Sequence, residues 1–257
     1  MNAEHWTPRH VQVKICGLTN FDDAAHAWAC GADLLGFILV PASPRYVTPG
    51  QVAEIAAALR AQGTVRGVKC PLLVGVVVEG ERESIRRLVA ESGVDVVQLH
   101  GVQATAELLA ALHTPAIAVH PVQVPGTLEV PGTSDAGTSA VDWAAMRAIP
   151  AWAHLLDTHD PKLLGGTGRA WDWSLAAAGG AFTRNDDRPE RWLVAGGLTP
   201  DTVGEAVRLL RPWGVDVSSG VEAAPGRKDH DAVARFIART RGASILEAKE
   251  GKEESCR

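Results

Sequence analysis

The chain has 257 residues and a net charge of −5 at neutral pH, and 46% of its residues are hydrophobic. This length allows one large domain or two small ones with a substantial buried core, and the acidic balance argues against a broad nucleic-acid-binding surface. No apolar stretch approaches the roughly 18 residues of a membrane helix, and the first residues lack the apolar run of a signal peptide. The four cysteines are scattered without a CxxC pair. We therefore expect a reduced, cytoplasmic protein with no membrane or nucleic-acid partner.

The first predicted strand lies in the stretch Val11–Thr19. Its β-branched residues Val11, Val13 and Ile15 alternate with other residue types, and Gly17 ends the pattern. Strand and helix patterns then alternate along the chain. Further strands are predicted at 33–39, 72–78, 94–99, 115–119, 153–157, 192–195 and 214–217, and helices at 22–29, 51–59, 82–91, 103–112, 141–148, 173–178, 200–210 and 229–240.

Eight strand patterns alternate with eight helix patterns, and no linker divides them. This favours a single-domain (β/α)8 barrel, the TIM barrel, over residues 1–241. A doubly wound open sheet is the alternative, because periodicity does not prove closure. Segments 121–139 and 179–190 are rich in small and turn-forming residues and are predicted to be loop insertions. Residues 242–257 are predicted to form a charged, disordered tail.

In such a barrel the active site is built at the carboxyl ends of the strands. The polar residues and glycines at those ends are Cys16, Arg45, Gln98, His100, Asp157, Gly196, Gly197, Ser218, Ser219 and Gly220. Lys14 lies two residues before Cys16 on the same strand face, which favours a reactive thiolate. A lone cysteine in an apolar strand is equally often a buried small hydrophobe. A Cys16 base and an Asp157 acid facing each other across the barrel mouth would suit proton transfer at carbon.

Three glycine-containing segments lie in the last third of the chain, at 165–168, 196–197 and 218–220. Glycine lets backbone N–H groups approach an anion, and barrels commonly bind phosphate after the seventh and eighth strands. Any one of these segments alone is more simply a tight turn. Together they predict a phosphorylated substrate held by Gly166, Gly168, Gly196, Gly197, Ser218, Ser219 and Gly220.

The predicted site also contains an arginine, a lysine–aspartate pair and a histidine. Arg45 lies in a turn above the barrel mouth and could bind a substrate carboxylate bidentately, although a single arginine in a turn is more often solvated. Strand alternation puts Lys14 and Asp216 on the inner face of the adjacent first and eighth strands, which predicts an ion pair. His100 is either a polar residue of the mouth or a core histidine. His154 and His159 have no spacing partners that would make a metal site, so no metal is expected.

With these residues assembled, the chain resembles the phosphoribosylanthranilate isomerase family of tryptophan biosynthesis. The resemblance covers nearly the whole chain. It rests on VKICGLT at 13–19, LGFIL at 35–39, SPRYV at 43–47, VVQLHG at 96–101, LLD at 155–157, GGTGRAWDW at 165–173, VAGGLTPDTV at 194–203, GVDVSSGVE at 214–222 and PGRKD at 225–229.

The resemblance implies an intramolecular aldose–ketose isomerase that needs no metal or organic cofactor. Its reaction converts N-(5-phosphoribosyl)anthranilate to 1-(2-carboxyphenylamino)-1-deoxyribulose 5-phosphate by an Amadori rearrangement. By this resemblance Asp157 is the general acid that opens the ribose ring, and Cys16 is the general base that removes the C2′ proton. Arg45 is implied to bind the anthranilate carboxylate. The sequence does not distinguish a monomer from a homodimer.

Three other functions are possible for a barrel of this kind, and each would call for different residues. Isomerases of the histidine pathway, or dual-specificity forms, carry an aspartate at the end of the first strand, where this chain has Cys16. Indole-glycerol-phosphate synthase would need lysines and glutamates at several strand ends. A silent barrel that only binds a phosphorylated ligand would have no need of both Cys16 and Asp157, and it would bind without turnover.

Overall fold

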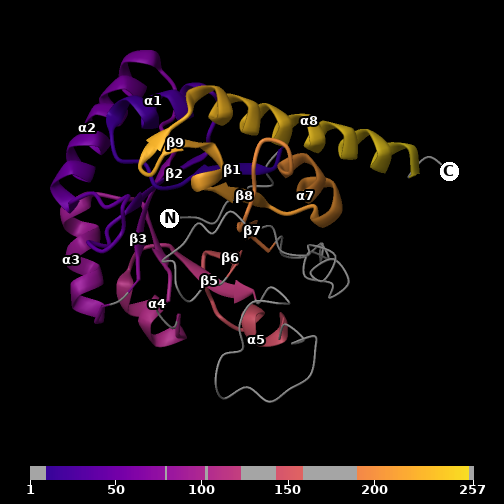
Figure 1. The fold of residues 1–257 in the computed structure, drawn as a ribbon. Coiled ribbons are helices and arrows are strands. Elements are labelled where there is room, and N and C mark those ends of the chain that lie inside the picture. Colours follow the sequence, from indigo (N-terminus) through magenta and orange to yellow (C-terminus); the bar gives the residue numbers. More distant parts are fainter. Residues whose placement is uncertain (1–9, 79, 102–103, 123–142, 159–189, 255–257) are drawn as a thin grey trace.

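The structure is a computed structural model that describes residues 10–78, 80–101, 104–122, 143–158 and 190–254; for residues 122, 158 and 245–254 it describes the backbone alone. Parallel strands close into an eight-stranded barrel, in which β1 pairs with both β2 and β8 (Figure 1). The strands are β1 (Gln12–Ile15), β2 (Leu34–Ile38), β3 (Leu72–Val77), β4 (Val96–Leu99), β5 (Ala116–Val122), β6 (Ala153–Thr158), β7 (Trp192–Val194) and β8 (Gly214–Val217). This closure confirms the predicted (β/α)8 barrel and excludes the open sheet.

Helices follow the strands and cover the outside of the barrel (Figure 1). They are α1 (Phe21–Ala29), α2 (Pro49–Arg66), α3 (Arg82–Ser92), α4 (Ala106–Leu112), α5 (Trp143–Arg147), α7 (Val203–Leu210) and α8 (His230–Glu254). The helix predicted at 173–178 and nearly all of the loop predicted at 179–190 lie outside the described residues. Among the described residues, no helix combines the length and hydrophobicity that crossing a bilayer requires.

Strand alternation separates the buried apolar residues into two layers. One cluster fills the barrel itself and includes Leu34, Val74, Val96, Ile117, Leu155 and Leu193. The larger cluster lies between strands and helices and includes Val13, Phe37, Val97, Leu156 and Phe236. Because apolar side chains fill this part of the barrel interior, a ligand can reach polar groups only at the carboxyl-terminal end of the strands.

Helix α2 begins at a capping box, in which the Thr48 and Gln51 side chains each bond to the other residue's backbone N–H. The prediction that this helix ends at residue 59 is wrong, because it continues to Arg66. Gly63, a weak helix former, is tolerated because the helix passes close to the Trp28 ring there, where an added Cβ would lie 3.2 Å from a ring carbon.

Two boundaries near the chain's predicted loops differ from expectation. Strand β5 extends through Val122, so the first two residues of the predicted 121–139 insertion belong to the strand, and 123–139 lie outside the described residues. Helix α8 does not end at Thr240 but continues through Gly242 into the predicted tail. Contacts to the start of β1 hold this extension: Ser244 Oγ accepts the Val11 N–H at 3.3 Å, and Arg241 donates to the Val11 carbonyl.

A short hairpin that the sequence did not predict follows β8. It begins with a single 3-10 turn, η1 (Ser219–Val221), and consists of β9 (Glu222–Ala224) and β10 (Arg227–Lys228). The turn between its strands contains Gly226, whose φ of 76° is in the left-handed region that glycine adopts without strain. The hairpin places charged side chains beside the barrel mouth, as described next.

Candidate active site

A cavity opens at the carboxyl ends of the barrel strands. Of the described residues predicted to form the site, all except Lys14 line this cavity: Cys16, Arg45, His100, Asp157, Gly196, Gly197, Asp216, Ser218, Ser219 and Gly220. His100 is only half-buried there, so it is a residue of the mouth rather than of the core. Gly166 and Gly168 lie outside the described residues, and their predicted phosphate-binding role stays a prediction.

The predicted ion pair between β1 and β8 is present. Lys14 and Asp216 are register partners in the two strands, and Lys14 Nζ lies 3.0 Å from Asp216 Oδ1. The Lys14 side chain is fully buried. Burial alone would lower the pKa of Lys14, but the Asp216 carboxylate and then the Cys16 sulfur raise it above its ordinary value. Lys14 is therefore a permanent cation beneath the cavity floor.

Cys16 is buried beside this pair, where Gly36 of β2 leaves room for it. A Cβ added at Gly36 would lie 2.9 Å from Cys16 Sγ and 3.1 Å from Lys14 Nζ. Burial raises the pKa of the Cys16 thiol, and the nearby Asp216 carboxylate adds to this, against the opposing effect of Lys14. The lowered thiol pKa that the neighbouring Lys14 led us to expect for a reactive thiolate is therefore wrong. Desolvation outweighs the single ammonium group from which that expectation was drawn.

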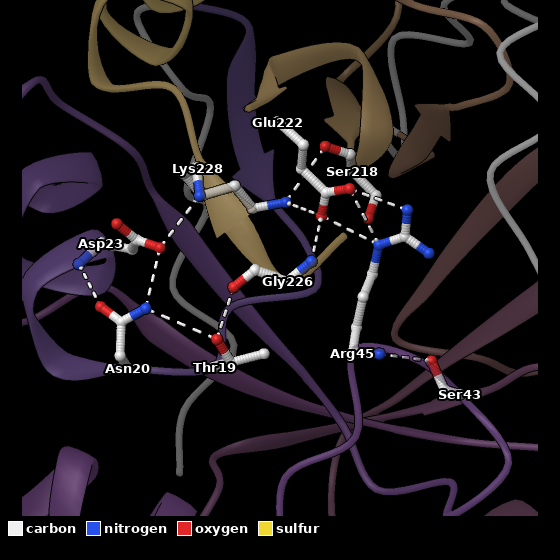
Figure 2. Close-up of polar contacts among 9 residues, drawn as sticks. All are labelled: Thr19, Asn20, Asp23, Ser43, Arg45, Ser218, Glu222, Gly226 and Lys228. Atoms are coloured by element: carbon white, nitrogen blue, oxygen red, sulfur yellow. Dashed lines mark hydrogen bonds and ion pairs between the residues drawn. The ribbon is translucent and has the colours of Figure 1, made fainter. Parts of the chain in front are cut away.

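Arg45 is neither solvated nor unpaired, because Glu222 of β9 binds it bidentately (Figure 2). Arg45 Nε lies 2.9 Å from Glu222 Oε1, and Arg45 Nη2 lies 2.8 Å from Glu222 Oε2. The two side chains are 10% and 5% exposed. Lys228 of β10 completes the cluster: its Nζ donates to Glu222 Oε1 at 2.9 Å and to the Ser218 carbonyl at 3.1 Å. Two cations thus share one carboxylate at the rim of the cavity.

The base of the hairpin is fastened to the start of α1 (Figure 2). Asp23 accepts the Lys228 backbone N–H at 3.0 Å, and Asn20 caps the helix by accepting the Asp23 N–H at 2.8 Å. The Thr19 hydroxyl donates to the Gly226 carbonyl. Backbone N–H donation, with Asn20 and His230, lowers the pKa of Asp23 although its burial acts to raise it. These bonds fix the hairpin's position against the barrel.

The glycines after β7 and β8 occupy positions where a side chain would be strained or would clash. Gly196 and Gly197 have φ values of 84° and 67°. A Cβ added at Gly220 would lie 1.9 Å from the Leu198 carbonyl oxygen. Only glycine fits at position 220, because any side chain would overlap the Leu198 carbonyl, and Gly220 itself lines the cavity.

Two buried polar atoms in this site have no hydrogen-bond partner in the described part of the protein: Gln98 Oε1 and Ser218 Oγ. Both residues line the cavity. An unsatisfied buried oxygen costs about 1–3 kcal/mol, so these atoms are suited to meet polar groups of a ligand. Sequence reasoning noted Gln98 at a strand end without giving it a role, and it missed Glu222 and Lys228. The opposite charges flanking the Pro-Gly turn at 225–226 were the available signal.

Comparison with known proteins places this geometry in a family. Residues 13–239 match the family model of N-(5′-phosphoribosyl)anthranilate isomerase. A protein of that name from Magnetococcus marinus is 38% identical over 233 residues, which cover 91% of this chain and 96% of the relative. One from Pelobacter propionicus is 38% identical over 249 residues, covering 96% of this chain and all of the relative.

Solved structures agree. The phosphoribosylanthranilate isomerase of Thermotoga maritima matches with a TM-score of 0.70 and 33% identity, over 90% of this chain and 99% of that one. A structure of phosphoribosylanthranilate isomerase with reduced 1-(o-carboxyphenylamino)-1-deoxyribulose 5-phosphate matches with a TM-score of 0.68 and 32% identity, over the same shares of the two chains. The chain therefore belongs to the N-(5′-phosphoribosyl)anthranilate isomerase family, the isomerases of tryptophan biosynthesis.

Proposed function

We propose that this chain catalyses the Amadori rearrangement of N-(5-phosphoribosyl)anthranilate, with Asp157 as the general acid and Cys16 as the general base. The observation that carries the proposal is that Asp157 of β6 and Cys16, which directly follows β1, line one cavity together with Arg45 and the glycine segments after β7 and β8. An acid and a base that share a cavity can act on the same substrate molecule, the acid at the ribose ring oxygen and the base at C2′.

In the first step, Asp157 donates a proton to the ribose ring oxygen as the C1′–O bond breaks. The lone pair of the anthranilate nitrogen forms a C1′=N iminium ion. In the second step, the Cys16 thiolate takes the C2′ proton, and the electrons of that C–H bond form a C1′=C2′ double bond and return the nitrogen to neutrality. The resulting enolamine tautomerises to the C2′ ketone, so the reaction neither gains nor loses atoms.

The electrostatics act on the proposed base in two directions. Burial raises the pKa of Cys16 and favours the thiol, whereas the ammonium groups of Lys14 and Lys228 favour the thiolate. Because the pKa of Cys16 is raised, the active thiolate form increases as pH rises. The proposal therefore predicts a kcat/KM that climbs with pH through the Cys16 pKa.

Two anionic ends of the substrate would be held separately. The free edge of Arg45 would bind the anthranilate carboxylate, and the backbones of Gly196–Gly197 and Ser218–Gly220 would bind the phosphate, with Gly166 and Gly168 as further predicted contacts. Arg45 lines the cavity, and the cations Lys14 and Lys228 lie behind it, paired with the carboxylates of Asp216 and Glu222. The guanidinium of Arg45 is therefore a positive group that such a ligand would meet. A reducing cytoplasm would keep Cys16 free of disulfides, so that its sulfur could act as the base.

Turnover of freshly generated phosphoribosylanthranilate, followed by loss of its fluorescence, tests the assignment. Cys16→Ser and Asp157→Asn should each lower kcat by at least about 10²-fold. Cys30→Ser, a half-buried thiol away from the cavity, and Asp201→Asn, on the surface, are matched controls that should keep wild-type rates. Activity that survives either site change would move the acid or base elsewhere. Phosphate-dependent binding without wild-type turnover would favour the silent barrel.

A further inference from the structure

The guanidinium of Arg45 has one edge occupied and one edge available. Arginine carries five N–H donors in a planar fork, and Glu222 takes the donor on Nε and one on Nη2. Figure 2 shows the remaining amino nitrogen on the side away from Glu222, with no bond to the residues drawn. A planar carboxylate needs two parallel N–H groups, and the Nη1–Nη2 edge offers them. The orientation of that edge is set by the bond to Glu222.

Glu222 is itself held by groups other than Arg45. Lys228 Nζ donates to Glu222 Oε1 at 2.9 Å, and the Gly226 backbone N–H reaches the same oxygen at 3.4 Å. Lys228 is fully buried, and its backbone is fastened to Asp23 at 3.0 Å. These bonds therefore hold the carboxylate of Glu222 in place, and the orientation of the Arg45 side chain depends on it.

The burial of this cluster gives Glu222 more than a packing role. The Arg45 and Glu222 side chains are 10% and 5% exposed, so the interaction is shielded from solvent, which makes charge-assisted bonds strong. Without the carboxylate, the buried cations Arg45 and Lys228 would repel each other. Arg45 would then lose both its partner and the reason to keep its free edge toward the cavity.

We infer that Glu222 is a positioning residue that orients Arg45 and thereby makes the site selective for a phosphorylated substrate with a second acidic group. The inference rests on the proposed carboxylate-binding role of Arg45. Glu222 does not line the cavity; it acts through the guanidinium. A role limited to cross-linking the hairpin would stabilise the fold and affect all ligands alike, whereas positioning affects only ligands that carry the carboxylate.

Glu222→Gln is the sharpest variant. It keeps the size of the side chain, and its carbonyl oxygen can still accept from Lys228, so the contact of Lys228 with the Ser218 carbonyl is preserved. Its amide NH2 would face an N–H donor of Arg45, so the bidentate bond cannot form. Glu222→Asp is the second variant, which keeps the negative charge but is one methylene too short to hold Arg45 in place. Glu54→Gln, on the exposed face of α2, is the charge-matched control.

The experiment measures the affinity of two probes by calorimetry: reduced 1-(2-carboxyphenylamino)-1-deoxyribulose 5-phosphate and the corresponding phenylamino compound without the carboxylate. Glu222→Gln should weaken the first probe by roughly 10- to 100-fold and the second by less than about twofold, the change expected where no contact is altered. The control should alter neither. In an Arg45→Met background, Glu222→Gln should have no further effect on the first probe, because the group through which it acts is gone.

The outcomes separate the two proposals. If Arg45→Met leaves the preference for the carboxylate probe intact, the proposed role of Arg45 fails and this inference fails with it. If Arg45→Met abolishes the preference but Glu222→Gln and Glu222→Asp retain it, only the inference is overturned. Equal weakening of both probes by the Glu222 variants shows a purely structural role and also overturns it. If Glu222→Gln does not fold, the same comparison with Glu222→Asp decides.

Discussion

Replacing Lys14 by methionine tests the energetics of the barrel's polar centre. Methionine is close to lysine in length but carries no charge, so Lys14→Met removes the ammonium with little change in packing. The change leaves the Asp216 carboxylate, which is 7% exposed, without the cation 3.0 Å away. An unpartnered buried charge is among the largest single destabilising features of a protein.

The expected loss of stability follows from this burial. Removing one partner of a buried ion pair costs about 3–5 kcal/mol, and for a protein of this size each kcal/mol lowers Tm by about 2–4 °C. Lys14→Met should therefore lower Tm by about 6–20 °C. The double variant Lys14→Met/Asp216→Leu removes both charges and should recover most of the loss. Without the ammonium group, the pKa of Cys16 should rise further, so the pH–rate profile of any active single variant should shift to higher pH.

Urea denaturation followed by tryptophan fluorescence measures these free energies, and Lys69→Met at an exposed position is the control. A loss below about 1 kcal/mol for Lys14→Met, the range of surface ion pairs, would refute the reasoning. So would a double variant as unstable as the single one, because the cost would then come from packing and not from the stranded carboxylate.

Three further predictions concern other buried groups. Gln98→Met removes an unsatisfied amide oxygen, so it should stabilise the fold by about 1 kcal/mol while raising KM; an unchanged KM would show that Gln98 meets no substrate. Burial, and then the neighbouring His154, lower the pKa of His120 to about 4. Because the unfolded chain binds that proton near pH 6.5, stability should fall by up to about 3 kcal/mol between pH 6.5 and 4, and urea titrations of His120→Phe should lack this part of the slope. Gly220→Ala drives a Cβ into the Leu198 carbonyl and should cost about 3 kcal/mol or more, whereas Gly242→Ala meets open space in α8 and should be neutral or stabilising in thermal melts.

Much of the fold was accessible from sequence because its signals are local. The apolar runs and the glycines that end them locate the strands to within a residue or two, as at Leu34–Ile38 and Leu72–Val77. Closure of the barrel makes β1 and β8 neighbours, and the alternation of side chains along each strand decides which residues point inward. Together they predict a contact between residues far apart in the sequence. The pairing of Lys14 with Asp216, 202 residues apart, follows from those two facts alone.

The rest of the site depends on geometry that no local pattern contains. Arg45 and Glu222 are 177 residues apart, and Glu222 sits on a partly exposed three-residue strand without hydrophobic alternation. The pKa of Cys16 depends on burial and on Asp216 as well as on Lys14, so inspection of the neighbouring residues alone gave the wrong direction. The extension of α8 past Thr240 is decided by contacts with Val11, at the other end of the barrel sequence.

The closure of β1 onto β8 also determines when the enzyme can exist during its synthesis. The strand that emerges from the ribosome first has one hydrogen-bonding edge that only residues 214–217 can satisfy, and the hairpin that holds Arg45 is made later still. Until residues 214–217 have been translated, β1 keeps an open edge, of the kind that invites pairing with other chains. A chain truncated before residue 214 is therefore expected to be an aggregation-prone fragment and not a partly active enzyme.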